Sequence, residues 1–397
     1  MKAGWQTKTL GEVLQKTETV NPVQSPETEF DYIDVSSVSN TSFEVEQTQR
    51  LKGKDAPSRA RKLVKTNDVI FATIRPTLRR IAIVPAHLDE QVCSTGYFVL
   101  RPKAVLDHRF VYYWLFSEEF MRQMEALQKG ASYPAVTDKE VRDQVIPFPT
   151  LPEQQRIVTL LDEAFAGIAT AKANAEKNLQ NARAIFESFL TTVYSARNKG
   201  WIDTPLHMLC RRITVGHVGS MANLYKPTGI PFLRSQNIRP FFVSMENMVF
   251  IDYEFHTALE KSSLKSGDLA IVRTGYPGTA AVIPDSLGVA NCSDLVIVRP
   301  GPEIDAHFLA AFFNSSFGKN MVSGKIVGAA QKHFNVGAAK DVLLHLPPLV
   351  EQRLIVNEID KLREETLRLE SIYQRKLAAL DELKKSLLHR AFTGHLT

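Results

Sequence analysis

The chain repeats itself once, and this repeat constrains its fold more than any other feature. A Leu-x-Glu-Gln-x-x-Ile-Val pattern runs from Leu151 and occurs again from Leu349, 198 positions later, so that Gln154 matches Gln352. A period of this length is far too long for a solenoid of stacked repeats. The pattern therefore favours duplication of a whole domain together with the helix that follows it.

Other matching segments occur in the same order in both halves of the chain. TNDVIFATIRPTLRRIAIVP from Thr66 matches SGDLAIVRTGYPGTAAVIP from Ser266, and CSTGYFVLRP from Cys93 matches CSDLVIVRP from Cys292. Short runs rich in Val, Ile and Phe, broken by Gly, Pro and Asn, predict strands joined by turns. DHRFVYYWLFSEEF predicts an amphipathic helix that begins at Asp107. We expect an α+β fold with mostly antiparallel sheets and an internal pseudo-two-fold repeat.

The repeat divides the chain into four segments. Globules of about 150 residues are long enough to bury their own cores. Each globule is followed by a long helix that begins at the repeated Glu-Gln pattern. The predicted segments are a first globule (1–150), a central spacer helix (151–198), a second globule (199–348) and a distal spacer helix with a C-terminal tail (349–397).

The two long helices are expected to pair with each other. Apolar residues from Ile355 onward follow a heptad spacing, interrupted by Thr366 and Lys376, and the first helix carries the same register with more alanine. Small residues opposite large ones allow close approach. A parallel pair would require the chain to return about 60 Å, so we expect an antiparallel coiled coil with a globule at each end. The seam residues are Ile157, Leu161, Ile168, Ile185, Phe189, Ile355, Ile359, Leu362, Leu369, Tyr373, Leu380, Leu383 and Leu387.

Basic residues are concentrated in one stretch of the first globule. The net charge of +5 is mild, yet residues 50–80 contain ten Lys and Arg residues against Asp55 and Asp68. A concentrated positive field favours an anionic partner on one face, although a solvated basic loop is an alternative interpretation of this stretch alone. Two related globules on a rod suit a two-part site on double-stranded DNA.

Candidate DNA contacts follow from side-chain chemistry. Arg suits guanine and Asn or Gln suits adenine, because each can form two hydrogen bonds with one base edge, whereas phosphate contacts position the protein. For any single residue, a structural role is an equal alternative. The phosphate candidates are Lys52, Lys54, Arg59, Arg61, Lys62 and Lys65; the base or groove candidates are Arg75, Thr77, Arg79 and Tyr133 in the first globule and Arg234, Gln236, Asn237, Arg239, Arg273, Tyr276, Gln331, Lys332 and His333 in the second.

Several common enzyme motifs are absent from the sequence. The Pro-Pro pair after Leu346 is flanked by Leu on both sides, so it offers neither an acceptor for a target amino group nor a ring to stack on a flipped base. GxxxxGK[ST], a GxGxxG after a strand, and HExxH are also absent, and the three cysteines are isolated. We therefore expect a non-catalytic chain that has no metal or cofactor of its own.

The sequence also predicts a cytoplasmic protein without a membrane partner. No window approaches the roughly 18 consecutive apolar residues of a membrane span, and the first residues lack the apolar core of a signal peptide.

The doubled helix starts, the long helices and the closing KKSLLHRAFTGHLT resemble the specificity subunit of type I restriction-modification systems. SGDLAIVRTGYPG and VIVRP also resemble the target-recognition domains of that family, whereas TIRPTLRR lacks their glycine turn. The resemblance implies that residues 1–150 and 199–348 are two target-recognition domains, each reading half of a bipartite, asymmetric DNA sequence. It also implies that the helix pair is a spacer and a docking surface for two methyltransferase subunits.

The same resemblance implies where the chemistry lies. The methyltransferase partners would bind S-adenosylmethionine and methylate adenine, and two restriction subunits, which use ATP and Mg²⁺, can join the complex. Two alternatives remain open at this point: a free-standing DNA-binding adaptor or regulator, and a coiled-coil scaffold that does not touch nucleic acid.

Overall fold

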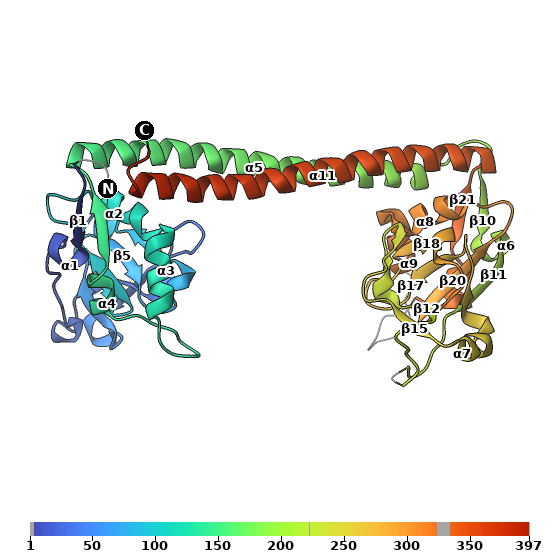
Figure 1. Cartoon of the computed structure of the whole chain (residues 1–397), viewed down its shortest axis with the longest axis horizontal. Coiled ribbons are helices and arrows are strands. Elements are labelled where there is room, and N and C mark those ends of the chain that lie inside the picture. Colours follow the sequence, from blue (N-terminus) through green and yellow to red (C-terminus); the bar gives the residue numbers. More distant parts are fainter. Residues whose placement is uncertain (1–3, 222, 324–333, 397) are drawn as a thin grey trace. The chain divides into compact units, whose positions relative to one another are not determined.

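A computed structural model describes residues 4–221, 223–323 and 334–396 (Figure 1). The chain forms two compact units, each with one globule and part of each long helix. Unit 1 comprises Met1–Ala175 and Arg375–Thr397, and unit 2 comprises Glu176–Gln374.

The sheets of unit 1 are mainly antiparallel. A four-stranded sheet has the order β3-β2-β7-β4 and contains the parallel pair β2–β7, while β6-β5-β8 and β1-β9 are antiparallel throughout. The strands are β1 (Gln6–Thr9), β2 (Glu29–Ile33), β3 (Gln49–Lys52), β4 (Ala60–Leu63), β5 (Val69–Ala72), β6 (Ile81–Ile83), β7 (Val92–Ser94), β8 (Tyr97–Leu100) and β9 (Val145–Phe148).

The sheets of unit 2 follow the same plan. The order β15-β12-β19-β16 again contains one parallel pair, β12–β19, and β11-β20-β17-β18 corresponds to β6-β5-β8 with one strand added. The strands are β10 (Ile202–Pro205), β11 (Cys210–Val215), β12 (Ile230–Leu233), β13 (Ile238–Arg239), β14 (Phe242–Val243), β15 (Val249–Ile251), β16 (Ser263–Leu264), β17 (Leu269–Val272), β18 (Ala280–Val282), β19 (Ala290–Cys292), β20 (Leu295–Pro300) and β21 (Leu343–Leu346).

Short helices cover these sheets, and two long helices run from one unit into the other. As predicted, Asp107 caps α2: its carboxylate accepts hydrogen bonds from the N–H groups of Arg109 and Phe110, and Asp305 caps α8 in the same way. The helices are α1 (Leu10–Val13), α2 (His108–Leu115), α3 (Glu118–Leu127), α4 (Asp138–Arg142), α5 (Leu151–Ser195), α6 (Leu206–Leu209), α7 (Tyr253–Ala258), α8 (Ala306–Asn314), α9 (Ser316–Ser323), α10 (Val336–Lys340) and α11 (Leu349–Phe392). In the described parts of the chain, none of them is long and apolar enough to span a membrane.

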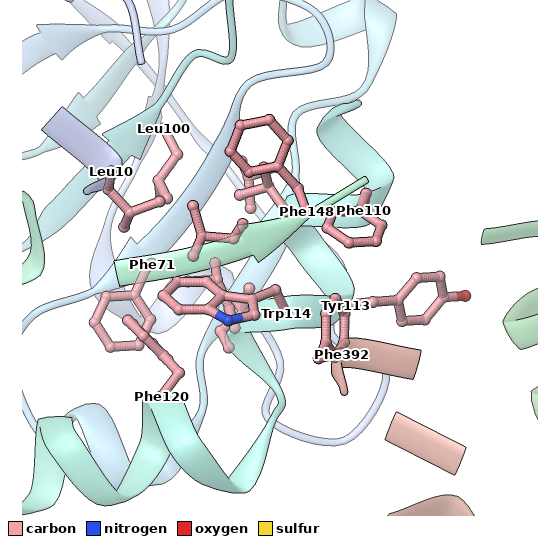
Figure 2. Packing of buried hydrophobic residues seen from close by; sticks show 14 of the residues in the cluster. Leu10, Phe71, Leu100, Phe110, Tyr113, Trp114, Phe120, Phe148 and Phe392 are labelled. Carbon is pink, nitrogen blue, oxygen red and sulfur yellow. The ribbon is translucent and has the colours of Figure 1, made fainter. Parts of the chain in front are cut away.

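The core of unit 1 is completed by residues from the far end of the sequence. Figure 2 shows Phe392 of α11 beside Phe110 of α2, and their ring centroids are 5.1 Å apart. Tyr194 of α5 has the corresponding role in unit 2, where its ring lies 5.1 Å from that of Phe308. The end of α11 therefore packs into the globule of unit 1, and the end of α5 packs into the globule of unit 2. Burying such aromatic side chains is a major source of stability.

Buried polar groups repeat as faithfully as the apolar core. Asp68 accepts two hydrogen bonds from Arg101, at 2.9 and 2.8 Å, and Asp268 accepts two from Arg299, at 2.8 and 2.7 Å. A buried carboxylate needs such a partner to offset its lost hydration. The two globules thus share an internal frame, which confirms the α+β repeat that the sequence predicted.

The long helices are antiparallel within each unit. In unit 1, Arg156 Nη2 donates to the carbonyl of Leu396 at 3.0 Å, and Lys172 forms an ion pair with Asp381. In unit 2, Arg183 lies 2.9 Å from the carboxylate of Glu370. As residue numbers increase along α5, the numbers of the contacting residues on α11 decrease, so the predicted antiparallel pairing is confirmed.

Predicted seam residues are buried near the start of each helix, but further along the buried positions shift away from the predicted ones. Ile185 is 59% exposed and Leu383 is 46% exposed, in contrast to the prediction, whereas Leu190 and Leu388 are buried. A helix with 3.6 residues per turn moves by about 20° per heptad relative to a strict seven-residue repeat, so the buried stripe advances by one position. Ile157, Leu161, Ile168 and Ile359 are buried, and Phe189, Ile355, Leu362, Leu369, Tyr373, Leu380 and Leu387 are half-buried.

Candidate nucleic-acid interface

The turn between β5 and β6 presents part of the predicted DNA surface of unit 1. Arg75 and Arg79 flank the short helical turn η4 (Pro76–Leu78), with φ values of 50° and 54°. A left-handed backbone is uncommon for residues other than glycine, so neighbouring contacts must hold this turn. One such contact is the 2.7 Å hydrogen bond from the Arg75 N–H to the carbonyl of Pro134. The side chains of Arg75, Thr77 and Arg79 are exposed.

Arg75 and Tyr133 meet at this turn although they come from separate segments. The Arg75 guanidinium lies 5.0 Å from the centre of the Tyr133 ring, and its Nη2 donates to the carbonyl of Ser132 at 3.2 Å. Tyr133 is 72% exposed. The stacked pair offers an exposed cation and an aromatic face, the chemistry that reads guanine or packs on a base.

The equivalent turn of unit 2 is built differently. Gly275 and Gly278 have φ values of 86° and 90°, which glycine adopts without strain. Arg273 is turned into the globule, where Nη1 pairs with Asp294 at 2.5 Å and Nε donates to the carbonyl of Phe334 at 3.3 Å. The base contact predicted for Arg273 stays a prediction, and it would have to compete with these internal bonds of Nε and Nη1. Tyr276 is 83% exposed on the same turn.

A second loop of unit 2 separates structural residues from exposed ones. Asn237 is fully buried; its Oδ1 accepts from the Arg234 N–H at 3.0 Å, and its Nδ2 donates to two backbone carbonyls at 3.1 Å. The base contact predicted for Asn237 is therefore at odds with the structure, since this amide holds the loop together. Arg234 is half-buried and donates to the carbonyl of Asn247, whereas Gln236 and Arg239 are exposed.

The basic stretch of unit 1 is partly neutralised by ion pairs. Lys52 and Lys54 both contact Glu27, at 2.9 and 3.4 Å. Exposed pairs of this kind contribute little, so these lysines can exchange Glu27 for a phosphate. Lys62 is more firmly held, because its Nζ lies 2.6 Å from both Asp138 and the carbonyl of Tyr97.

The remaining predicted residues differ in how far their side chains are engaged by the protein itself. Lys65 lies 3.7 Å from Glu18, and Arg61 is half-buried, with Nη1 donating to the carbonyl of Ala60. Arg59 is exposed. Gln331, Lys332 and His333 lie outside the described residues.

The described residues offer no obvious centre for metal chemistry. Among them, no group of three or more His, Cys, Asp or Glu side chains is placed to hold a metal ion. Cys93 is buried, and this burial raises the pKa of its thiol to about 12. Its thiol therefore stays protonated at neutral pH, a poor state for metal binding or nucleophilic attack.

Sequence reasoning missed two residues that contact the long helices, Phe43 and Phe241. Lys384 lies over the Phe43 ring, and Arg363 lies over the Phe241 ring. The signal was available, because these phenylalanines are separated by the same 198 positions as the helix starts.

Comparisons with protein families and with known sequences identify proteins that are similar to this chain. Residues 2–180 match the family model described as the type I restriction modification DNA specificity domain. The specificity subunit of type I restriction enzyme EcoKI from Escherichia coli is 23% identical over 323 residues, covering 77% of this chain and 69% of that protein. The StySPI specificity subunit from Salmonella potsdam is 25% identical over 331 residues, covering 77% and 69%.

Solved structures resemble the whole chain. One chain, from work on complex assembly and conformational transition of the type I restriction-modification system, has a TM-score of 0.86 at 27% identity, covering 100% of this chain and 99% of that one. The HsdS subunit from Thermoanaerobacter tengcongensis has a TM-score of 0.73 at 27% identity, covering 100% and 98%.

Proposed function

This chain belongs to the specificity-subunit family of type I restriction-modification systems, and we propose that its two globules read the two halves of a bipartite, asymmetric DNA sequence. One observation carries the proposal: the two globules share their internal structure but differ in the residues that their equivalent turns expose. The Asp68 and Asp268 ion pairs are the same in both units. The turn after β5 exposes Arg75, whereas the turn after β17 exposes Tyr276. Globules with the same internal structure and different exposed turns suit the recognition of two different half-sites.

The long helices would serve as the spacer and as the docking surface for two methyltransferase subunits. Exposed apolar side chains on α11 support this assignment, since residues that are four positions apart, such as Val350 and Leu354, lie next to each other on the helix surface and form an apolar patch that suits a protein partner. The exposed apolar residues of α11 are Val350, Leu354, Leu367, Ile372 and Leu383.

Catalysis would then lie in the partner subunits. The methyltransferases would hold S-adenosylmethionine, and two restriction subunits would use ATP and Mg²⁺. This chain would contribute recognition and geometry only, without a catalytic residue or cofactor of its own. A variant of the complex that lacks this chain should therefore keep its S-adenosylmethionine site and lose its sequence specificity.

The decisive experiment is methylome sequencing of cells that carry this chain with its methyltransferase. We expect adenine methylation at two short, different half-sites separated by a fixed gap of unspecified sequence. Methylation at a single uninterrupted or palindromic sequence would contradict the proposal. Salt-dependent binding to duplex DNA without co-purification of the methyltransferase would instead identify a free-standing DNA-binding adaptor.

A further inference from the structure

Each unit holds one phenylalanine in an unusual backbone conformation. Phe43 has a φ of 59° and Phe241 a φ of 73°. Each lies two residues before a valine that forms a β-bridge across the loop containing the phenylalanine. Val45 pairs with Val38 in unit 1, and Val243 pairs with Ile238 in unit 2. A bulky residue remains in the left-handed region only where surrounding contacts hold it there.

In unit 1, the Phe43 ring contacts Lys384 of α11 and lies 4.8 Å, between ring centroids, from Phe116 at the end of α2. Lys384 of α11 lies between two rings, with its Nζ 5.7 Å from the centre of Phe43 and 4.9 Å from the centre of Phe165 of α5. Burial and the nearby positive charges of Lys172 and Arg79 lower the pKa of Lys384. An ammonium group that has lost water is attracted more strongly to aromatic faces.

Unit 2 brings together the same kinds of group from exchanged positions, although here the phenylalanine, rather than the cation, makes both contacts. The Arg363 guanidinium lies 4.9 Å from the centre of the Phe241 ring, and the Phe186 ring lies 5.9 Å from it. Arg363 occupies the position that matches Phe165 in the repeat, and Phe186 occupies the position that matches Lys384. One ring and one cation are therefore kept in both units, although the positions that supply them are reversed. Preservation of a combination, rather than of residues, points to a requirement for the contact itself.

The contact lies at the edge of the core that joins each globule to its helices, since Phe165 packs against that core in unit 1 and Phe241 does so in unit 2. Lys384 precedes Phe392 by eight residues, which is about 12 Å along a helix, and Phe186 precedes Tyr194 by the same interval. The aromatic contacts of Phe392 and Tyr194 are made with α2 and α8, whereas Phe43 lies between β2 and β3 and Phe241 lies between β13 and β14. One attachment point permits a hinge motion, and a second point 12 Å away, to the same approximation, restrains it.

We propose that Phe43 and Phe241 are positioning residues that clamp each globule at a fixed angle on the helix pair, each through one ring and one cation. Resting on the proposed function, this inference adds a specific consequence: the clamp sets how strictly the gap between the two DNA half-sites is measured. A released globule can tilt and reach a half-site that is displaced by one base pair. Base recognition within each half-site is unaffected, because the turns that carry it keep their structure.

The test uses the full chain assembled with its methyltransferase and a set of duplexes whose half-sites are constant and whose gap varies one base pair at a time. Phe43→Ala should lower the preference for the correct gap about tenfold, the scale of a partly desolvated cation–π contact. The half-sites in the methylome should stay the same. Ser386→Ala, at an exposed polar position two residues after Lys384, is the control and should keep the strict gap.

The exchanged arrangement supplies a second, independent test. Phe165→Lys alone leaves two cations, and Lys384→Phe alone leaves two helix rings, so both should relax the gap. The double variant restores one ring and one cation in the order found in unit 2, and it should recover the strict gap. The outcome also decides the matter if Phe43→Ala fails to fold.

Different failures have different meanings. If the wild-type complex methylates no two-part site, the proposed function is wrong. If the wild-type complex has a strict gap and all three single variants retain it while remaining folded, the clamp is wrong. A double variant that is no stricter than either of its single variants would also overturn the clamp.

Discussion

Gln154 receives a hydrogen bond of 2.8 Å on its Oε1 from the backbone N–H of Asp107, the residue that caps α2. The Nε2 group of the same side chain donates to the carbonyls of Val105 and Pro149, at 3.0 and 2.9 Å. Gln352 makes the equivalent three bonds in unit 2 and is likewise fully buried. The glutamine of the repeated Glu-Gln pattern thus ties the start of each long helix to the start of a globule helix.

Replacing this glutamine should destabilise unit 1. Gln154→Ala leaves one buried N–H and two carbonyls without their partner, and a loss of about 3 kcal/mol is expected from the cost of unsatisfied buried groups. Hydrogen exchange at residues 103–110 in increasing urea would measure it. Gln155→Ala removes an exposed neighbouring amide and should change little. Equal effects of the two substitutions would refute the role of Gln154.

The exposed Arg75 and the internally bonded Arg273 should respond differently to substitution. Arg75→Ala is expected to relax one position of a half-site, with discrimination falling by about 1–3 kcal/mol, because a bidentate guanine contact contributes that much. Methylome sequencing of the variant would identify the position. Arg273→Ala should instead weaken the fold around Asp294, and a loss of base preference at constant stability would contradict this view.

Asn237 and Gln236 provide a matched comparison within one loop. Asn237→Ala should lower the free energy of unfolding by about 2 kcal/mol, because it leaves buried backbone groups of the loop unpaired. Gln236→Ala should leave stability unchanged, since that side chain is exposed. Thermal unfolding of both variants separates the two residues; a stable, folded Asn237→Ala protein with altered DNA specificity would restore the sequence-based assignment.

The buried thiol of Cys93 and the half-buried thiol of Cys210 should resist alkylation in the native protein. Burial raises the pKa of Cys93 and of Cys210 to about 12, whereas an exposed thiol ionises near 8.5. Iodoacetamide at pH 8 should therefore label these residues slowly until the chain unfolds. Because the unfolded thiols lose protons first, native stability should also fall as the pH rises above about 8.5. Fast native labelling, followed by mass spectrometry, would show that one of these sites opens readily.

Sequence patterns predicted the repeat because each equivalent residue performs the same task in its unit. The matched Asp, Gln and helix starts could be found by comparison alone, and so could the antiparallel helix pair. The parallel strand pairs β2–β7 and β12–β19 could not, since they join segments about 60 residues apart with no local signal.

The limits of sequence reasoning at the interface have physical causes. Arg273 and Asn237 have the side chains that read bases, yet a carboxylate and backbone carbonyls of the fold engage them first. Chemical type alone does not reveal whether a donor faces inward. The seam likewise drifted at Ile185 and Leu383, because the straight helix does not keep a strict heptad. The clamp phenylalanines match across the repeat, but their contacts with the long helices depend on the three-dimensional fold and could not be predicted from that match.

The packing of Phe392 against Phe110 imposes an order on biosynthesis. A ribosome adds roughly 5–20 residues per second, and domains generally fold as their segments emerge. The first globule is made early, but its core is completed only when Phe392 and Leu396 appear, after all of Glu176–Gln374 has been synthesised. Unit 2 has its complete set of residues sooner. The unit that is translated first is therefore the last to have its complete core, and until then its apolar side chains lack the cover that α11 provides.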